Sequence, residues 1–229
     1  MIILEGKSLC KYYGEGENKV RAVDNIDFSV HKGDFISIIG QSGAGKSTLM
    51  HIIGGLDRPT SGEVILNGTS MYSLPDHKLA IFRRRQIGFV FQAYNLIPVL
   101  NVWENVILPL GLDGQEADVQ YIEDVLDTLN ITEKKGSLPN TLSGGQQQRV
   151  AIARALASKP SIILADEPTG NLDSKTSEDV LTMLQLSVAK YNQTLIIVTH
   201  DEQIASRADR IVRVQDGIIV GGSLHETHH

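Results

Sequence analysis

The sequence is poor in cysteine, in long apolar runs and in excess positive charge, the features typical of secreted, membrane-embedded and nucleic-acid-binding proteins. Its single cysteine, Cys10, cannot form an internal disulfide, so nothing indicates an oxidising compartment. Basic residues number 21 against 27 acidic ones, and the formal net charge of -6 argues against a nucleic-acid partner bound mainly through its phosphates. No window approaches the roughly 20 apolar residues that cross a bilayer, and no basic leader opens the chain. We therefore expect a soluble chain without a signal peptide, whose membrane function, if any, belongs to another polypeptide.

What the sequence does have is a glycine-rich segment between an apolar strand-like run and an apolar helix-like run. Its glycines lack a Cβ, so the loop can curl until several backbone N–H groups point at one phosphate chain. Lys46 adds a positive charge, Ser47 offers a hydroxyl to Mg²⁺, and the following helix adds its positive N-terminus. A phosphate-binding loop (P-loop) is favoured over a glycine-rich turn without a ligand. The residues predicted to bind nucleotide here are Gly40, Ser42, Gly43, Gly45, Lys46, Ser47 and Thr48.

Strand-like and helix-like segments alternate along most of the chain. The strand-like run at 34–39 is mostly apolar and those at 162–165 and 195–198 are apolar throughout, which predicts a mainly parallel sheet covered on both faces. We expect an α/β fold: a P-loop NTPase core, an antiparallel β layer at the N-terminus and an inserted α-helical subdomain. The predicted parts are a core at 1–92 and 159–222, a helical subdomain at 93–158 and a His-rich tail at 223–229.

Three further helices are predicted from spacing and composition. One runs from Val102 to Leu110 and closes near Pro109, and another from Asp201 to Ala208. A third, at 76–86, contains three consecutive arginines at 83–85, which we interpret as a solvated helix face in preference to a nucleic-acid patch. The tail could in principle bind a metal, but a solvated end is the favoured interpretation.

Polar residues follow several of the predicted strands, at the edge where open α/β sheets bind ligands. Asp166 is placed to hold Mg²⁺, directly or through water, and Glu167 to polarise the water that attacks a γ-phosphate. His200 ends another strand and is predicted to hydrogen-bond the γ-phosphate, although an isolated histidine is more often an ordinary structural residue. Gln92 also follows a buried strand and could reach Mg²⁺ or water.

The segment Leu142–Gln146 predicts a second anion-binding device. Ser143 can begin a helix, while Gly144 and Gly145 expose the N–H groups at the positive end of that helix. A plain helix cap would explain the serine, but it would not require two glycines, which are poor helix formers.

Taken together, these motifs resemble the nucleotide-binding subunits of ATP-binding-cassette (ABC) transporters over nearly the whole chain. The resemblance implies an ATPase that binds ATP and Mg²⁺ as a head-to-tail homodimer, with Ser143, Gly144, Gly145 and Gln146 of one copy closing over the ATP of the other. It also implies that Tyr13 stacks on adenine, with Tyr12 as the fallback. Gln92 would be the Q-loop residue facing the membrane partner, and Asp173 the D-loop acid at the dimer interface.

The finer resemblance is to the LolD- and MacB-like branch, carried by the stretches 89–98, 104–110 and 168–173. It implies a peripheral subunit on the cytoplasmic face of the cell membrane, driving a permease with a large extracytoplasmic domain that handles lipoproteins, macrolides or antimicrobial peptides. The nearest alternative is an FtsE-like ATPase that regulates a cell-wall process without transport. A soluble ABC-type ATPase acting on DNA or ribosomes, and a P-loop kinase or GTPase, are the remaining alternatives.

Overall fold

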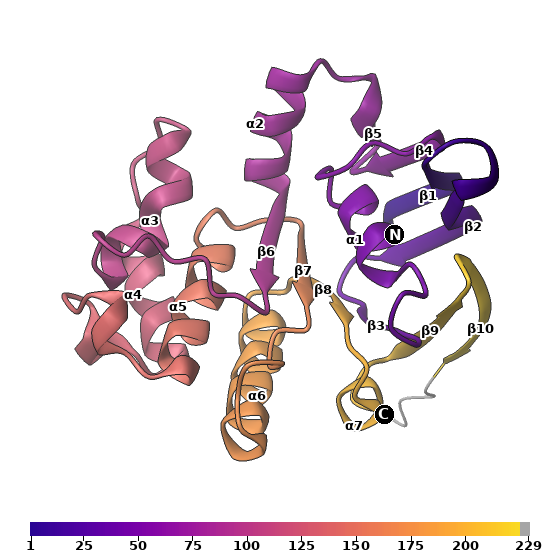
Figure 1. Ribbon diagram of the computed structural model, residues 1–229. Coiled ribbons are helices and arrows are strands. Elements are labelled where there is room, and N and C mark those ends of the chain that lie inside the picture. Colours follow the sequence, from indigo (N-terminus) through magenta and orange to yellow (C-terminus); the bar gives the residue numbers. More distant parts are fainter. Residues whose placement is uncertain (225–229) are drawn as a thin grey trace. The chain divides into compact units, whose positions relative to one another are not determined.

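A computed structural model describes residues 1–224 of the 229-residue chain (Figure 1). The chain forms two compact units, one made of residues 1–83 with the segment from 194 onward, and the other of residues 84–193. The histidines of the predicted tail, His225, His228 and His229, lie outside the described residues.

The first unit contains an antiparallel sheet at the N-terminus and a mostly parallel group of strands. The antiparallel sheet has the order β2-β1-β4-β5, with β1 at Ile2–Tyr13, β2 at Val20–His31, β4 at Ser61–Leu66 and β5 at Thr69–Ser70. In the second group β3 (Phe35–Ile39) pairs in parallel with both β8 (Thr194–Val198) and β9 (Arg210–Gln215), and β10 (Ile218–Leu224) pairs antiparallel with β9. This antiparallel layer lies at the N-terminus, where the sequence predicts it.

Three helices complete this part of the chain. They are α1 at Lys46–Ile53, α2 at Asp76–Gln86, which leads into the second unit, and the short α7 at Glu202–Ala205. Helix α1 packs against β2 and β8, and α7 packs against β3. Single 3-10 turns lie at Gly16–Asn18 and Met71–Ser73 in this unit, and at Thr132–Lys134 and Pro139–Thr141 in the second unit.

The second unit combines two parallel strands with four helices. Strand β6 (Ile87–Phe91) pairs in parallel with β7 (Ile162–Asp166). The helices are α3 at Val102–Leu112, α4 at Val119–Thr128, α5 at Gly144–Ala157 and α6 at Ser174–Lys190. Helix α5 contacts α3, α4, α6 and β6, so it is the centre of this unit (Figure 1). The predicted α/β class, with an antiparallel layer and mainly parallel strands, is confirmed.

Two predicted helix ends are wrong, each because of a tertiary contact. Helix α3 continues past Pro109 to Leu112. The proline removes one backbone donor, but the Arg84 guanidinium donates to the Leu112 carbonyl and α3 packs along α5. Helix α7 ends at Ala205, three residues early, because the Asp209 N–H donates to the Phe35 carbonyl and draws the chain into β9.

The arginine run at 83–85 is only in part the solvated face that the sequence predicts, since the Arg85 side chain is 53 % exposed but all three arginines bond to other elements. Arg83 donates to the Gly55 carbonyl at 2.8 Å within the first unit. In the second unit Arg84 and Arg85 both pair with the buried Asp113 carboxylate, with the Arg85 Nε at 2.6 Å. These side chains hold elements together, since burying Asp113 requires a cationic partner.

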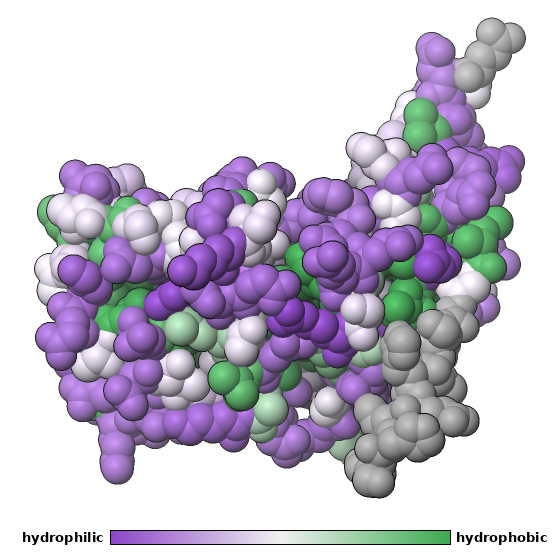
Figure 2. Space-filling model, turned by 90° about the horizontal axis from the view of Figure 1, so that it is seen from below, coloured by the Kyte–Doolittle hydropathy of each residue, from purple (hydrophilic) through white to green (hydrophobic). Residues whose placement is uncertain are grey.

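Among the described residues no helix is long and apolar enough to cross a membrane. The face of the molecule drawn in Figure 2 is mostly hydrophilic, with hydrophobic residues in separate patches.

One buried side chain organises the loop between β6 and α3. Asn105 has no exposed surface, and its amide Nδ2 donates to the carbonyls of Ile97, Leu100 and Asn101 at 2.8–3.1 Å. Its Oδ1 accepts from the Ile97 N–H at 2.8 Å. One side chain therefore satisfies four backbone groups of a loop that has no sheet or helix to pair with.

We predict that Asn105→Ala lowers the free energy of unfolding by about 2–4 kcal/mol, because it removes a fully buried side chain and the bonds that this side chain makes to the Leu100 carbonyl and the Ile97 N–H. Urea denaturation followed by circular dichroism measures the change. Asn140→Ala, at an exposed position of the same unit, serves as the control and should stay within about 0.5 kcal/mol of wild type. Equal stabilities of the two variants would contradict the role of Asn105.

Candidate nucleotide-binding site

The predicted phosphate-binding loop lies between β3 and the N-terminus of α1. Gly45 caps the helix with a φ of 101°, and Lys46 is the first helical residue. The Lys46 side chain is 8 % exposed, and its Nζ donates to the carbonyls of Gly40 and Gln41, each at 2.8 Å. The ammonium group is thus held against the carbonyls of its own loop, beside the positive end of α1. This is the local geometry that the sequence predicts.

The glycines are needed because the loop passes very close to two other segments. A Cβ on Gly45 would lie 2.0 Å from the Ala22 carbonyl oxygen of β2, and one on Gly40 would lie 2.1 Å from the Val214 oxygen of β9. The Gly217 N–H, in the turn between β9 and β10, donates to the Ala44 carbonyl at 3.0 Å. The loop is therefore held between β2 and the β9–β10 hairpin.

A hollow of about 350 Å³ opens beside this loop. Its lining combines the loop and the start of α1 with Arg21 of β2 and Asp216 of the β9–β10 turn. Sequence reasoning missed these last two residues. An Asp-Gly pair between strand-like runs is a local hairpin signal, but only the folded chain shows that this turn reaches the loop.

Tyr13 and Tyr12, the alternative adenine-stacking residues, have different surroundings. Tyr13 is 44 % exposed, and its pKa is raised by burial and by its hydrogen bond to Asp57, while a hydrogen bond with Thr48 of the P-loop lowers it. Tyr12 has two cations over its ring, with the Lys19 Nζ at 4.3 Å from the ring centre, and donates its hydroxyl to Asp24. Tyr13 is exposed and Tyr12 only partly so, which leaves Tyr13 the more accessible of the two.

His200 lies at the same edge of the parallel strands as the P-loop. Ile38 of β3 pairs with Val198 of β8, and the Thr199 N–H donates to the Ile38 carbonyl at 3.2 Å. The P-loop begins two residues after Ile38, and the exposed His200 follows Thr199. Within the first unit the structure thus brings two predicted features, the P-loop and His200, to one edge.

The predicted acids and Gln92 lie together in the second unit. Phe91 pairs with Asp166 in the β6–β7 register, so Gln92 and Glu167 directly follow paired positions. Glu167 has a φ of 44°, a left-handed conformation that is uncommon for glutamate and is found most often at functional sites. Gln92 is held by Asn171, since its Nε2 donates to the Asn171 Oδ1 at 3.1 Å and the Asn171 Nδ2 donates to the Gln92 carbonyl at 3.0 Å.

The serine-glycine segment has the predicted form of a helix start. Ser143 caps α5 in a reciprocal pair with Gln146, in which each side chain accepts from the other's backbone N–H. The two glycines also have a packing role that the sequence did not show. A Cβ on Gly144 would lie 2.7 Å from the Tyr94 hydroxyl, and one on Gly145 would lie 2.4 Å from the Thr176 methyl group.

Asp173 caps α6, and the same Thr176 is its partner. Its carboxylate accepts from the Thr176 N–H at 3.1 Å and from the Thr176 hydroxyl at 2.6 Å, bonds that hold its pKa below the usual value. The start of α5 and the start of α6 therefore pack together through Thr176.

The donors available for Mg²⁺ are few and mixed. Among the described residues no group of three or more His, Cys, Asp or Glu side chains could hold a metal. Mg²⁺ prefers oxygen ligands and takes one or two from the protein together with waters and substrate phosphates, and the Ser47 hydroxyl and the Asp166 carboxylate are oxygen donors of this kind. A phosphate-binding loop, a serine hydroxyl after it and an acid at a strand end define the class: a P-loop nucleotide-binding ATPase.

Comparison with known proteins identifies the family. Residues 23–170 match the ABC transporter family model. The chain is 42 % identical to the lipoprotein-releasing system ATP-binding protein LolD of Acinetobacter baylyi, covering 97 % of this chain and 99 % of that protein. It is 48 % identical to the macrolide export ATP-binding/permease protein MacB of Mannheimia succiniciproducens, covering 96 % of this chain and 34 % of that protein. The chain thus spans about a third of the length of MacB.

A solved structure agrees with these relatives. The dimeric post-hydrolysis state of the ATP-binding cassette MJ0796, bound to ADP and Pi, matches with a TM-score of 0.85 and 42 % identity, covering 97 % of this chain and 98 % of that one. The chain belongs to the ABC transporter family. It is an ATP-binding subunit with ATPase activity, so the resemblance and the enzyme class predicted from the motifs are confirmed.

We predict that Gly45→Ala lowers the free energy of unfolding more than Gly43→Ala does, by at least about 1 kcal/mol. Both variants place an alanine at positive φ, but only the methyl group at 45 meets a backbone oxygen, since nothing lies within 4 Å of a Cβ at 43. Chemical denaturation of both variants measures the difference. A Gly43→Ala protein as unstable as Gly45→Ala would show that backbone conformation, and not contact with β2, determines the loss.

Proposed function

We propose that two copies of this chain close head to tail around two ATP molecules with Mg²⁺ and so drive a separate membrane permease. The solved relative MJ0796 is a dimer bound to ADP and Pi, which supports the dimer. The relative LolD is the ATP-binding protein of a lipoprotein-releasing system, and MacB joins a cassette of this kind to a permease in one chain. These relatives support a permease partner for a chain that has only the cassette.

The P-loop would bind the phosphates of ATP. Its backbone N–H groups and the N-terminus of α1 would surround the phosphate chain, and the Lys46 ammonium would leave the loop carbonyls for the β- and γ-phosphates. Mg²⁺, when bound, neutralises charge on the β- and γ-phosphate oxygens. The residues proposed to hold it are the Ser47 hydroxyl, the Asp166 carboxylate and the Gln92 amide.

Glu167 would act as the general base of hydrolysis. Its carboxylate takes a proton from water as the water oxygen bonds to the γ-phosphorus, and the bond from that phosphorus to the bridging oxygen of ADP breaks. His200 would donate a hydrogen bond to the γ-phosphate and hold the water in line. The left-handed backbone at Glu167 supports this role, because strain of about 1–3 kcal/mol is retained where it serves a site.

The signature Ser143–Gln146 of one copy would complete the ATP site of the other. The capped start of α5 offers an N-terminus to the γ-phosphate, and Asp173 would lie at the interface between copies. The packing of both helix starts on Thr176 supports a common movement of signature and D-loop, in which residues 93–158 form the arm that carries the signature.

Gln92 would connect hydrolysis to the permease. It is held by Asn171 of the D-loop on one side and continues into the loop pinned by Asn105 on the other. We place the subunit on the cytoplasmic face of the membrane, with a permease that has a large extracytoplasmic domain and handles lipoprotein, macrolide or antimicrobial peptide. The comparisons do not favour the FtsE-like alternative, because the named relatives are of the LolD and MacB type.

We predict that Lys46→Ala loses ATP affinity by at least about tenfold, because charge-assisted bonds to phosphate contribute roughly 1.5–3 kcal/mol. Glu167→Gln should keep wild-type ATP affinity, hydrolyse ATP at least about 100-fold more slowly and accumulate as a dimer with ATP. Isothermal titration, phosphate release and light scattering after size exclusion measure the three properties. A Glu167→Gln protein that hydrolyses ATP at the wild-type rate would remove Glu167 from the role of base.

A further inference from the structure

Two charged residues, Asp57 and Lys11, contact the side chain of Tyr13. The Asp57 Oδ2 accepts from the Tyr13 hydroxyl at 2.8 Å, and the Oδ1 accepts from the Lys11 Nζ at 2.6 Å. The same Lys11 Nζ lies 5.0 Å from the centre of the Tyr13 ring and also donates to the Arg58 carbonyl at 2.8 Å. The ring is therefore fixed at its hydroxyl end and covered by a cation.

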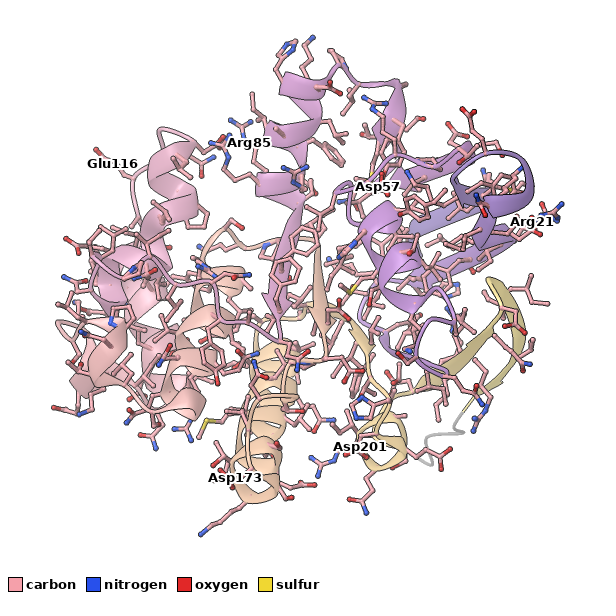
Figure 3. All side chains as sticks on the ribbon, viewed as in Figure 1. Arg21, Asp57, Arg85, Glu116, Asp173 and Asp201 are labelled. Carbon is pink, nitrogen blue, oxygen red and sulfur yellow. The ribbon has the colours of Figure 1, made fainter. Side chains whose placement is uncertain are left out.

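The carboxylate that holds the hydroxyl is fixed to the helix that starts at the P-loop. Asp57 follows α1, and its N–H donates to the His51 carbonyl in the last turn at 3.2 Å. The Tyr72 hydroxyl donates to the Asp57 carbonyl at 2.6 Å from the other side. Figure 3 labels Asp57 beside α1. Helix α1 begins with Lys46 of the P-loop, and Asp57 is bonded to the other end of this helix. The Tyr13 ring is therefore linked to the P-loop through Asp57 and α1.

The Asp57 carboxylate stays ionised and the Tyr13 hydroxyl stays protonated at neutral pH. Although burial opposes it, hydrogen bonds from Lys11 and Tyr13 hold the pKa of Asp57 below its usual value. Burial, and then the bond to Asp57, raise the pKa of Tyr13, so its hydroxyl stays protonated and continues to donate. The pair is only partly buried, with side-chain exposures of 14 % for Lys11 and 33 % for Asp57.

From this geometry we infer that Asp57 and Lys11 are positioning residues that hold Tyr13 as a stacking platform for the base of the nucleotide. They would thereby set the preference of this chain for a nucleoside triphosphate over an inorganic polyphosphate. Lys11 covers part of the ring, the hydroxyl is bonded to Asp57, and 44 % of the residue stays open to receive a base. When the aromatic side chain is already fixed in place, it loses less rotamer entropy as a base stacks on it, so binding costs less free energy. The inference rests on the proposed nucleotide site.

The test compares two ligands that share the phosphates and differ in the base. ATP and inorganic tripolyphosphate, each with Mg²⁺, are titrated into the full chain by isothermal calorimetry. We expect Asp57→Ala to weaken ATP binding by about 5- to 30-fold, part of the effect of losing one stacked base. Tripolyphosphate binding should change less than twofold. Lys11→Met, which keeps most of the side-chain stem, should give the same selective loss and serves if Asp57→Ala does not fold.

A matched control and a double variant separate positioning from plain structure. Asp76→Asn removes another acid that pairs with an arginine, Arg58, in the same unit, and should leave both affinities unchanged. In a Tyr13→Ala background, Asp57→Ala should cause no further loss of ATP affinity, because a positioning residue acts only through the ring. Further loss in that background would overturn the inference.

The other outcomes are equally decisive. Equal weakening of ATP and tripolyphosphate by Asp57→Ala would mean that the residue supports the P-loop and not the base, and no weakening of either would mean that the ring needs no support. Both results overturn the inference and leave the proposed function intact. If the wild-type chain bound neither ligand, the proposed function itself would fail, and the inference with it.

Discussion

The first unit depends on one close approach of backbone to backbone. The P-loop passes β2 so tightly that the Ala22 carbonyl occupies the space of a Gly45 side chain, while the Gly217 N–H bonds to the loop on another side. Three segments that are far apart in sequence therefore fix the curl of this loop. The N-terminal antiparallel layer is thus part of the candidate nucleotide site.

The second unit uses the same kind of contact at a different place. Gly145 leaves room for the Thr176 methyl group, and Thr176 in turn receives the cap of Asp173. The signature and D-loop residues are therefore also the residues that hold α5 and α6 together. A substitution at Gly145 or Asp173 would change both the packing of α5 on α6 and the proposed contact with ATP or the partner copy. A loss of activity alone would therefore not show which of the two roles was lost.

Much of the fold follows from local signals in the sequence. The helix at 76–86 has the predicted bounds, because its spacing and composition are encoded locally. The ends at Pro109 and Ala208 were wrong, since the actual ends depend on a guanidinium and a strand from elsewhere in the chain. Rules that consider only neighbouring residues in the sequence cannot predict contacts with such distant partners.

The candidate site shows the same division. Lys46, Glu167 and Ser143 were found because their chemistry is concentrated in short motifs. Asp57 and Lys11 were missed, since they lie 46 positions apart and meet only through folding, and so were Gln92 and Asn171 as a pair, 79 positions apart. Residues that position others carry no motif of their own, and only the hydrogen bonds reveal them.

The central claim is that each ATP is bound by the P-loop of one copy and the signature of another. A structure of the Glu167→Gln protein with ATP and Mg²⁺ tests it most directly. We expect two ATP molecules between two chains, each in contact with Lys46 of one chain and with Ser143 of its partner. ATP in contact with a single chain, or a dimer joined through any other surface, would contradict it.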